Sequence, residues 1–144
     1  MPRVRSILET CLYVDDLDRA RSFYTDLFEL PVIIRDDRFC ALAVSRDDVL
    51  LLFRRGASAQ ALQIPWGVMP AHDSRGPAHF AFGIESDDVE PWRERLAQFG
   101  VAIESEVHWP LGGTSFYFRD PDGHAVELAT PGIWDFSVLD GPEE

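Results

Sequence analysis

Glu9, His79 and Glu127 each lie in a strand-like segment whose other residues are mostly apolar. Side chains of an extended strand alternate between its two faces, so these three groups point away from the bulky neighbours that pack a core. An ionised carboxylate on a half-buried strand is costly unless it is paired or bound to a metal. Because no arginine or lysine lies inside the three segments, we expect the carboxylates to have another partner.

Two carboxylates and one imidazole suit a borderline-to-hard divalent cation and leave positions open for water or substrate. Each residue also has a purely structural explanation: Glu9 at a wet strand edge, His79 as a hydrogen-bonded core histidine, and Glu127 facing solvent. Together the three residues favour a metal site, provided that the fold brings their strands to one cavity.

The elements that would position these residues follow the same order twice. A strand, an amphipathic helix and three short strands are expected over residues 6–14, 17–30, 32–35, 39–45 and 48–54. The order restarts over residues 79–84, 89–99, 101–107, 114–119 and 124–129. Glu9 then matches His79, and Leu12 matches Phe82, which indicates an internal duplication. Such a duplication can bring Glu9, His79 and Glu127 to one cavity.

Each half is too small to bury a good core alone, so we expect one domain over residues 1–144. Its modules would cover about residues 6–55 and 76–131. The joining loop, residues 56–78, is long and contains Pro65-Trp66-Gly67. Loops of that length are often functional lids or linkers.

Several aromatic residues fall in expected loops or at module ends and are candidates for an apolar substrate pocket: Trp66, Trp109, Phe116 and Trp134. His108, next to Trp109, is a further pocket candidate that could act as an acid or base. His72 is either an exposed loop histidine or a group that reaches the cavity, and His124 is expected at the surface. Cys11 and Cys40 lie in apolar strands and are predicted to be buried, without a disulfide.

Composition excludes several classes of function. The 25 acidic residues against 13 basic ones give a net charge of −12, which disfavours nucleic acid and anionic membrane surfaces as partners. Every basic residue is arginine, so no lysine is present for Schiff-base chemistry. The residues after Met1 form no apolar targeting segment, and a cytoplasmic protein is expected.

Three stretches resemble the vicinal oxygen chelate superfamily, the group of glyoxalases, bleomycin-resistance proteins and extradiol dioxygenases. They run from Leu8 to Tyr24, from Gly76 to Phe82 and from Phe116 to Leu128, and the last contains the specific Asp120-Pro-Asp-Gly turn before Glu127. The resemblance spans roughly residues 6–131. It implies an α+β fold in which two βαβββ modules form an incomplete barrel around a cavity, in a homodimer.

The resemblance also implies metal ligands at Glu9, His79 and Glu127. The cation would be Mn, Ni, Zn, Mg or Fe, chelating vicinal oxygens of a small substrate, with Glu9 or Glu127 as the base. Hemithioacetal-isomerising glyoxalases have a fourth ligand, a glutamate, on the matching strand of the first module. Here Leu51 occupies that position.

Two classes of function follow from this resemblance. The first is a metal-dependent enzyme, for which a glyoxalase-like lyase or isomerase is favoured over an extradiol dioxygenase or a thiol transferase. The second is a metal-free binding protein of the bleomycin-resistance type, in which Trp66, Trp109 and Trp134 would enclose an aromatic molecule. Binding proteins of that type usually lack the three metal ligands. Because this chain has a potential ligand at all three positions, the enzyme is favoured.

Overall fold

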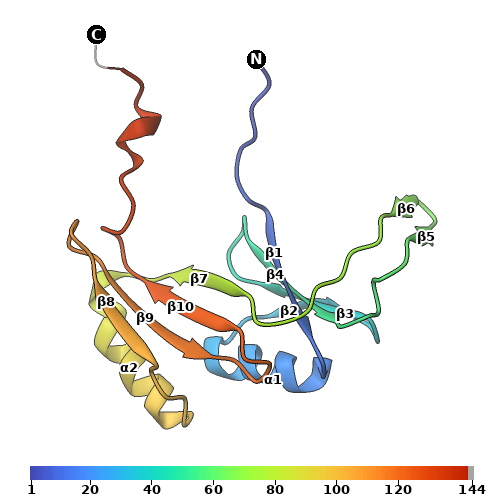
Figure 1. Cartoon of the computed structure of the whole chain (residues 1–144), viewed down its shortest axis with the longest axis horizontal. Helices are drawn as coiled ribbons and strands as arrows, with labels where there is room; N and C mark the ends of the chain where they lie inside the picture. Colours follow the sequence, from blue (N-terminus) through green and yellow to red (C-terminus); the bar gives the residue numbers. More distant parts are fainter. Residues whose placement is uncertain (143–144) are drawn as a thin grey trace. The chain divides into compact units, whose positions relative to one another are not determined.

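The computed structural model describes residues 1–142 and divides between Ala78 and His79 into two compact units (Figure 1). The first unit contains β1 (Glu9–Val14), α1 (Leu17–Phe28), β2 (Val32–Arg35), β3 (Phe39–Ala43) and β4 (Val49–Arg54). Its sheet has the order β1-β4-β3-β2, with β1 and β4 parallel and the other pairs antiparallel. Asp16 caps α1 because its Oδ1 accepts a hydrogen bond from the N–H of Arg19 at 3.0 Å.

The second unit repeats this topology. It contains β7 (His79–Gly83), the 3₁₀ helix η1 (Ser86–Asp88), α2 (Val89–Gln98), β8 (Ser105–His108), β9 (Thr114–Arg119), β10 (Ala125–Ala129) and the 3₁₀ helix η2 (Phe136–Leu139). The sheet order β7-β10-β9-β8 corresponds strand for strand to that of the first unit. The predicted duplication of a βαβββ module is therefore confirmed.

The joining segment differs from the expected irregular loop. It contains a short antiparallel hairpin of β5 (Leu62–Ile64) and β6 (Gly67–Met69), connected by Pro65 and Trp66. Ile64 pairs with Gly67, so the two intervening residues form a tight connection.

In each unit the helix covers one face of the sheet, and the strand side chains on that face are buried. In the first unit these are Leu12, Val14, Leu42, Leu50 and Leu52, and in the second they are Phe116, Phe118, Val126 and Leu128. Strand alternation places Glu9 and Cys11 of β1, and His79 and Ala81 of β7, on the opposite face. That parity is the one expected from the sequence.

Two side chains lie where they were not expected. Cys11 is exposed because it belongs to the uncovered face of its sheet, whereas Cys40 is buried as predicted. His124 is fully buried instead of lying at the surface. The turn before it folds inward, since Oδ1 of Asp120 accepts hydrogen bonds from the N–H groups of Asp122 and His124 at 3.0 and 2.9 Å.

Over residues 1–142, none of the helices has the length and apolar character that crossing a bilayer requires. The cytoplasmic location, the homodimer and the incomplete barrel stay predictions.

Candidate functional site

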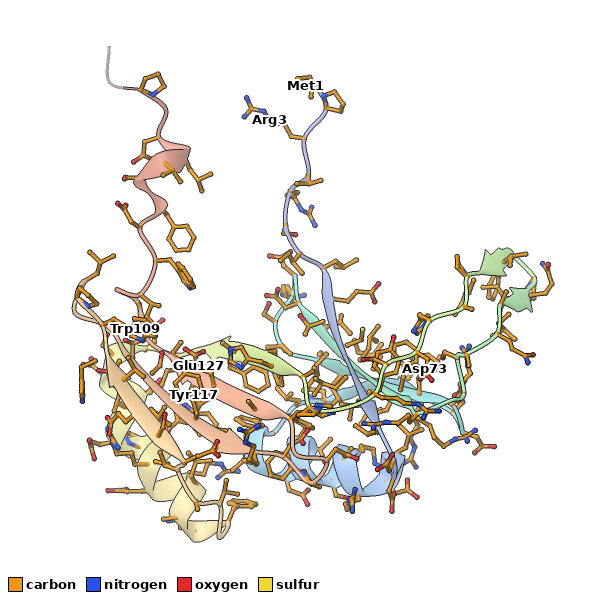
Figure 2. The ribbon with its side chains drawn as sticks, in the orientation of Figure 1. Met1, Arg3, Asp73, Trp109, Tyr117 and Glu127 are labelled. Carbon is orange, nitrogen blue, oxygen red and sulfur yellow. The ribbon has the colours of Figure 1, made fainter. Side chains whose placement is uncertain are left out.

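The open face of the second sheet gathers polar groups from three neighbouring strands. Glu127 on β10 pairs in register with Tyr117 on β9 and with Ala81 on β7, and paired residues project to the same face. His79 lies two residues before Ala81 on β7, and Ser115 lies two residues before Tyr117 on β9. Side chains two residues apart on a strand point to the same face, so His79 and Ser115 share the face of Glu127. Figure 2 shows Trp109, Tyr117 and Glu127 in this part of the chain.

His79 and Glu127 are in direct contact. The Nε2 atom of His79 lies 3.2 Å from Oε1 of Glu127, and the other ring nitrogen, Nδ1, lies 2.9 Å from the carbonyl oxygen of Ala125. A carbonyl only accepts, so Nδ1 carries a proton and donates it. In neutral imidazole, Nε2 then presents its lone pair toward the carboxylate.

Glu127 is only 7% exposed, and its second oxygen is held from the opposite side. The hydroxyl of Ser115 donates to Oε2 at 2.5 Å, and the indole Nε1–H of Trp109 donates to the Ser115 oxygen at 2.9 Å. These bonds stabilise the ionised carboxylate within the sheet.

Tyr117 completes the polar cluster. Its ring centroid lies 6.0 Å from that of His79, with the two planes at 35°. The pKa of the phenol is raised, first by burial and then by the negative charge of Glu127 and a hydrogen bond with that carboxylate, while a hydrogen bond with Ser115 opposes the shift. Tyr117 is therefore a neutral hydrogen-bond donor at neutral pH.

A pocket of about 710 Å³ opens over this cluster. Small residues form part of its floor, namely Ala81, Gly83 and Ala129, and the segment after β10 supplies apolar wall residues, namely Ile133, Trp134 and Phe136. An apolar pocket with a few converging polar groups is the usual form of a small-molecule site.

The contact between His79 and Glu127 fits a divalent cation. A lone pair on Nε2 facing a carboxylate oxygen is repulsive unless a proton or a cation lies between the two atoms. Histidine ligands of metals commonly donate their second ring N–H to a backbone carbonyl, as Nδ1 of His79 does here. His79 is half exposed toward the pocket, which leaves access for a cation and its remaining ligands.

The third expected ligand, Glu9, lies in the first unit as the exposed first residue of β1. Within either unit of the described chain, residues 1–142, no three His, Cys, Asp or Glu side chains gather as metal ligands. The second unit thus brings together two of the three predicted ligands, and the participation of Glu9 stays a prediction.

Two of the five predicted pocket residues, Trp109 and Trp134, line the pocket of the second unit. Trp66 connects β5 and β6 in the first unit and is 88% exposed. His108 and Phe116 depart from the expectation, because strand parity turns both toward the other face of the sheet. His108 lies 3.4 Å from the Thr114 hydroxyl, and Phe116 is buried in the core.

The corresponding face of the first sheet is filled instead of open. Tyr13 and Phe53 stand where the second unit has Gly83 and Ala129, and their rings stack at 5.8 Å. His72 covers them from the joining segment, with its Nδ1 2.5 Å from the Tyr13 hydroxyl. In this register Leu51 corresponds to Glu127, as the sequence comparison of the two halves indicated.

Sequence reasoning missed Ser115 and Tyr117. Both lie on the strand next to Glu127, and alternation through Phe116 and Phe118, which are core residues, places them on the polar face. The pattern could have identified them, because two buried aromatic residues at alternate positions leave the intervening side chains on the opposite face.

Comparison with known proteins agrees with this fold. A family model described as Glyoxalase/Bleomycin resistance protein/Dioxygenase superfamily matches residues 6–128. The curated Metallothiol transferase FosB of Bacillus licheniformis is 28% identical over 123 residues, which are 85% of this chain and 73% of that protein.

Two solved structures are similar over most of their length. Lactoylglutathione lyase from Agrobacterium tumefaciens has a TM-score of 0.85 and 33% identity, covering 94% of this chain and 100% of that one. The fosfomycin resistance protein FosX from Listeria monocytogenes has a TM-score of 0.65 and 25% identity, covering 89% of this chain and 94% of that one.

Proposed function

Because the chain belongs to the glyoxalase/bleomycin resistance protein/dioxygenase superfamily, we propose that it is a metal-dependent enzyme acting on a small oxygenated substrate. The observation that carries the proposal is the contact of His79 Nε2 with Glu127 Oε1 at 3.2 Å, at the wall of a substrate-sized pocket. His79 and Glu127 would hold the cation, with Glu9 as the third ligand. A bound divalent cation supplies Lewis-acid stabilisation of negative charge on substrate oxygens.

The chain's own residues would bind and orient the substrate. Tyr117 keeps its phenolic proton and donates it to the Glu127 carboxylate, so this phenol would help to orient Glu127 at the pocket. Trp109 and Trp134 line the pocket and offer apolar surface to a substrate. Glu127 or Glu9 would serve as the base that accepts a substrate proton.

We favour a lyase or isomerase reaction on a thiol adduct. The support is the similarity to a lactoylglutathione lyase over the full length of that structure. Transfer of a thiol to a small electrophile is the second candidate, because a metallothiol transferase and a fosfomycin resistance protein are also similar to this chain. Leu51, which replaces the fourth ligand of hemithioacetal-isomerising glyoxalases, leaves the first-unit sheet without a carboxylate at that position.

The first experiment measures metal content by native mass spectrometry and by elemental analysis after purification with Mn²⁺ or Zn²⁺. We expect one cation per chain, and loss of most of it in Glu127→Ala and His79→Ala. Glu94→Ala is the matched control, since Glu94 is an exposed carboxylate on α2. Unchanged metal content in Glu127→Ala would contradict the proposed site, whereas an unsubstituted chain that binds no cation would favour the metal-free binder.

Glu9 requires a separate variant. If Glu9 is the third ligand, Glu9→Ala, which removes the ligating oxygens, will weaken cation binding while the fold, followed by circular dichroism, stays intact. Equal affinity in Glu9→Ala and the unsubstituted chain would remove Glu9 from the ligand set.

A further inference from the structure

A continuous hydrogen-bond chain of three side chains ends on Glu127. The indole Nε1–H of Trp109 donates to Oγ of Ser115 at 2.9 Å, and Oγ of Ser115 donates to Oε2 of Glu127 at 2.5 Å. Ser115 and Glu127 are buried, so bulk water does not compete for these bonds. Trp109 comes from the β8–β9 turn, whereas Glu127 lies on β10.

The chemistry of the groups gives this chain one direction. An indole nitrogen can only donate, so the Ser115 oxygen must accept at that contact. A serine hydroxyl carries a single proton, and with the indole on one side that proton is directed to Glu127. Oε2 of Glu127 is therefore held by Ser115, and Oε1 is the oxygen that faces Nε2 of His79.

We propose that Trp109 is a positioning residue that, through Ser115, selects Oε1 of Glu127 as the cation-facing oxygen. The inference rests on the proposed metal function. Without the indole N–H, the Ser115 hydroxyl is free to rotate toward another acceptor, and the carboxylate loses the hydrogen bond that holds Oε2. Outer partners of metal ligands typically contribute about 10- to 100-fold in metal affinity.

The turn that carries Trp109 is itself held in place. The backbone N–H of Trp109 donates to the carbonyl of Gly113 at 2.8 Å, and the N–H of Gly113 donates to the carbonyl of Gly132 at 3.0 Å. A Cβ atom on Gly113 would lie 2.7 Å from the backbone of residues 131 and 132, so only glycine allows this approach. The indole is thus presented by a backbone with little freedom to shift.

The test compares four variants in their affinity for Zn²⁺ alone, measured by titration calorimetry. Trp109→Phe keeps an aromatic ring but removes the N–H. Ser115→Ala removes the hydroxyl, whereas Ser115→Thr keeps a hydroxyl at that position. Trp92→Phe, on α2 and away from the pocket lining, is the matched control for the loss of an indole. We expect about 10- to 100-fold weaker binding in Trp109→Phe and Ser115→Ala. Binding within about 3-fold of the unsubstituted chain is expected in Ser115→Thr and Trp92→Phe, since both keep the Trp109 N–H and a hydroxyl at position 115.

A double variant separates positioning from general loss of packing. If Trp109 acts through Ser115, the double variant Trp109→Phe/Ser115→Ala will bind Zn²⁺ no more weakly than Ser115→Ala alone. Additive losses in the double variant would overturn the inference.

The second readout is independent of metal. The chain has four tryptophans, and the indole N–H signal of Trp109 in a ¹H–¹⁵N spectrum is identified by its disappearance in Trp109→Phe. We expect this signal to move in Ser115→Ala without metal, and to move in the unsubstituted chain on addition of Zn²⁺. An unmoved signal in Ser115→Ala would overturn the hydrogen-bond chain.

The outcomes distinguish the two proposals. If the unsubstituted chain binds no Zn²⁺, the proposed function fails and the role of Trp109 fails with it. If Zn²⁺ binds through Glu127 with equal affinity in the unsubstituted chain and Trp109→Phe, only the role of Trp109 is overturned.

Discussion

The carboxylate of Glu127 is tolerated within a sheet because its neighbours donate to it. Ser115 donates to Oε2, and Tyr117 lies directly across the strand pair. In the first unit the matching positions hold Phe39 and Ala41, whose side chains cannot donate a hydrogen bond. A carboxylate at Leu51 would consequently lack the partners that Glu127 has.

Leu51→Glu is expected to lower the free energy of unfolding by about 2 kcal/mol or more, because a half-buried charge would lose water without gaining donors. Urea unfolding at neutral pH measures the difference. Leu51→Met is the control, for which a similar volume predicts a loss below about 1.5 kcal/mol. Equal stability of the two variants would show that the face around Leu51 can accommodate a charge.

Tyr13 makes stability dependent on alkaline pH. Burial, followed by the charge of Cys11 and a hydrogen bond with it, raises the pKa of the phenol above its ordinary value of 10.0. The folded chain therefore holds this proton more tightly than the unfolded chain does. The resulting stabilisation is complete below pH 10 and is lost as the pH rises through the folded-state pKa.

Tyr13→Phe removes this titration, so its free energy of unfolding will fall less steeply above pH 10 than that of the unsubstituted chain. At neutral pH we expect a loss of about 1 kcal/mol, because the hydrogen bond with His72 is gone. Urea unfolding over a series of pH values measures both effects. Parallel pH profiles for the two proteins would contradict the assignment.

At the scale of elements, the alternation of side chains along β9 puts core residues on one face of the sheet and site residues on the other. Ser115 and Tyr117 face the pocket side, whereas Phe116 and Phe118 are buried on the helix side. The guanidinium of Arg93 on α2 lies 5.4 Å from the ring centroid of Phe116, which places that ring beneath the helix. His108 on β8 belongs to the same side but at its exposed edge.

Phe116→Ala is expected to destabilise the fold by about 3–5 kcal/mol, the usual cost of removing a buried phenylalanine. His108→Ala should change stability by less than about 0.5 kcal/mol, since the side chain is largely exposed. Thermal and urea unfolding measure both changes. A mild effect of Phe116→Ala would indicate that the ring is not part of the core.

The contact between the β8–β9 turn and the segment after β10 depends on Gly113. Gly113→Ala is expected to cost about 1–3 kcal/mol, because its Cβ would overlap the backbone of residues 131 and 132. Gly83→Ala is the comparison, as a Cβ there meets no atom within 4 Å. Similar melting temperatures for both variants would contradict the tight approach.

At the scale of the whole molecule, the net charge of −12 opposes the compact state through self-repulsion. Raising NaCl from low to physiological ionic strength shortens the Debye length to about 8 Å and should raise the melting temperature at neutral pH. The control is a solution at the pI of about 4.6, where the same salt should have little effect. An equal gain at both pH values would show that salt acts by another route than charge screening.

Local patterns in the sequence determined most of the architecture. The alternation in β1, β7 and β10 showed which side Glu9, His79 and Glu127 would take, and the helical spacing after Asp16 predicted α1. The matching order of elements revealed the duplication, and with it the equivalence of Leu51 and Glu127. These features depend on neighbours a few residues away, so they can be inferred from the chain alone.

The tertiary structure decided what those faces contain. Tyr13, Phe53 and His72 fill the first sheet, while Gly83 and Ala129 leave a pocket over the second. The link from Trp109 through Ser115 to Glu127 arises from a turn and a strand register that bring three separate segments together. Such contacts depend on pairing across the sheet and on how closely backbones approach, which no local pattern specifies.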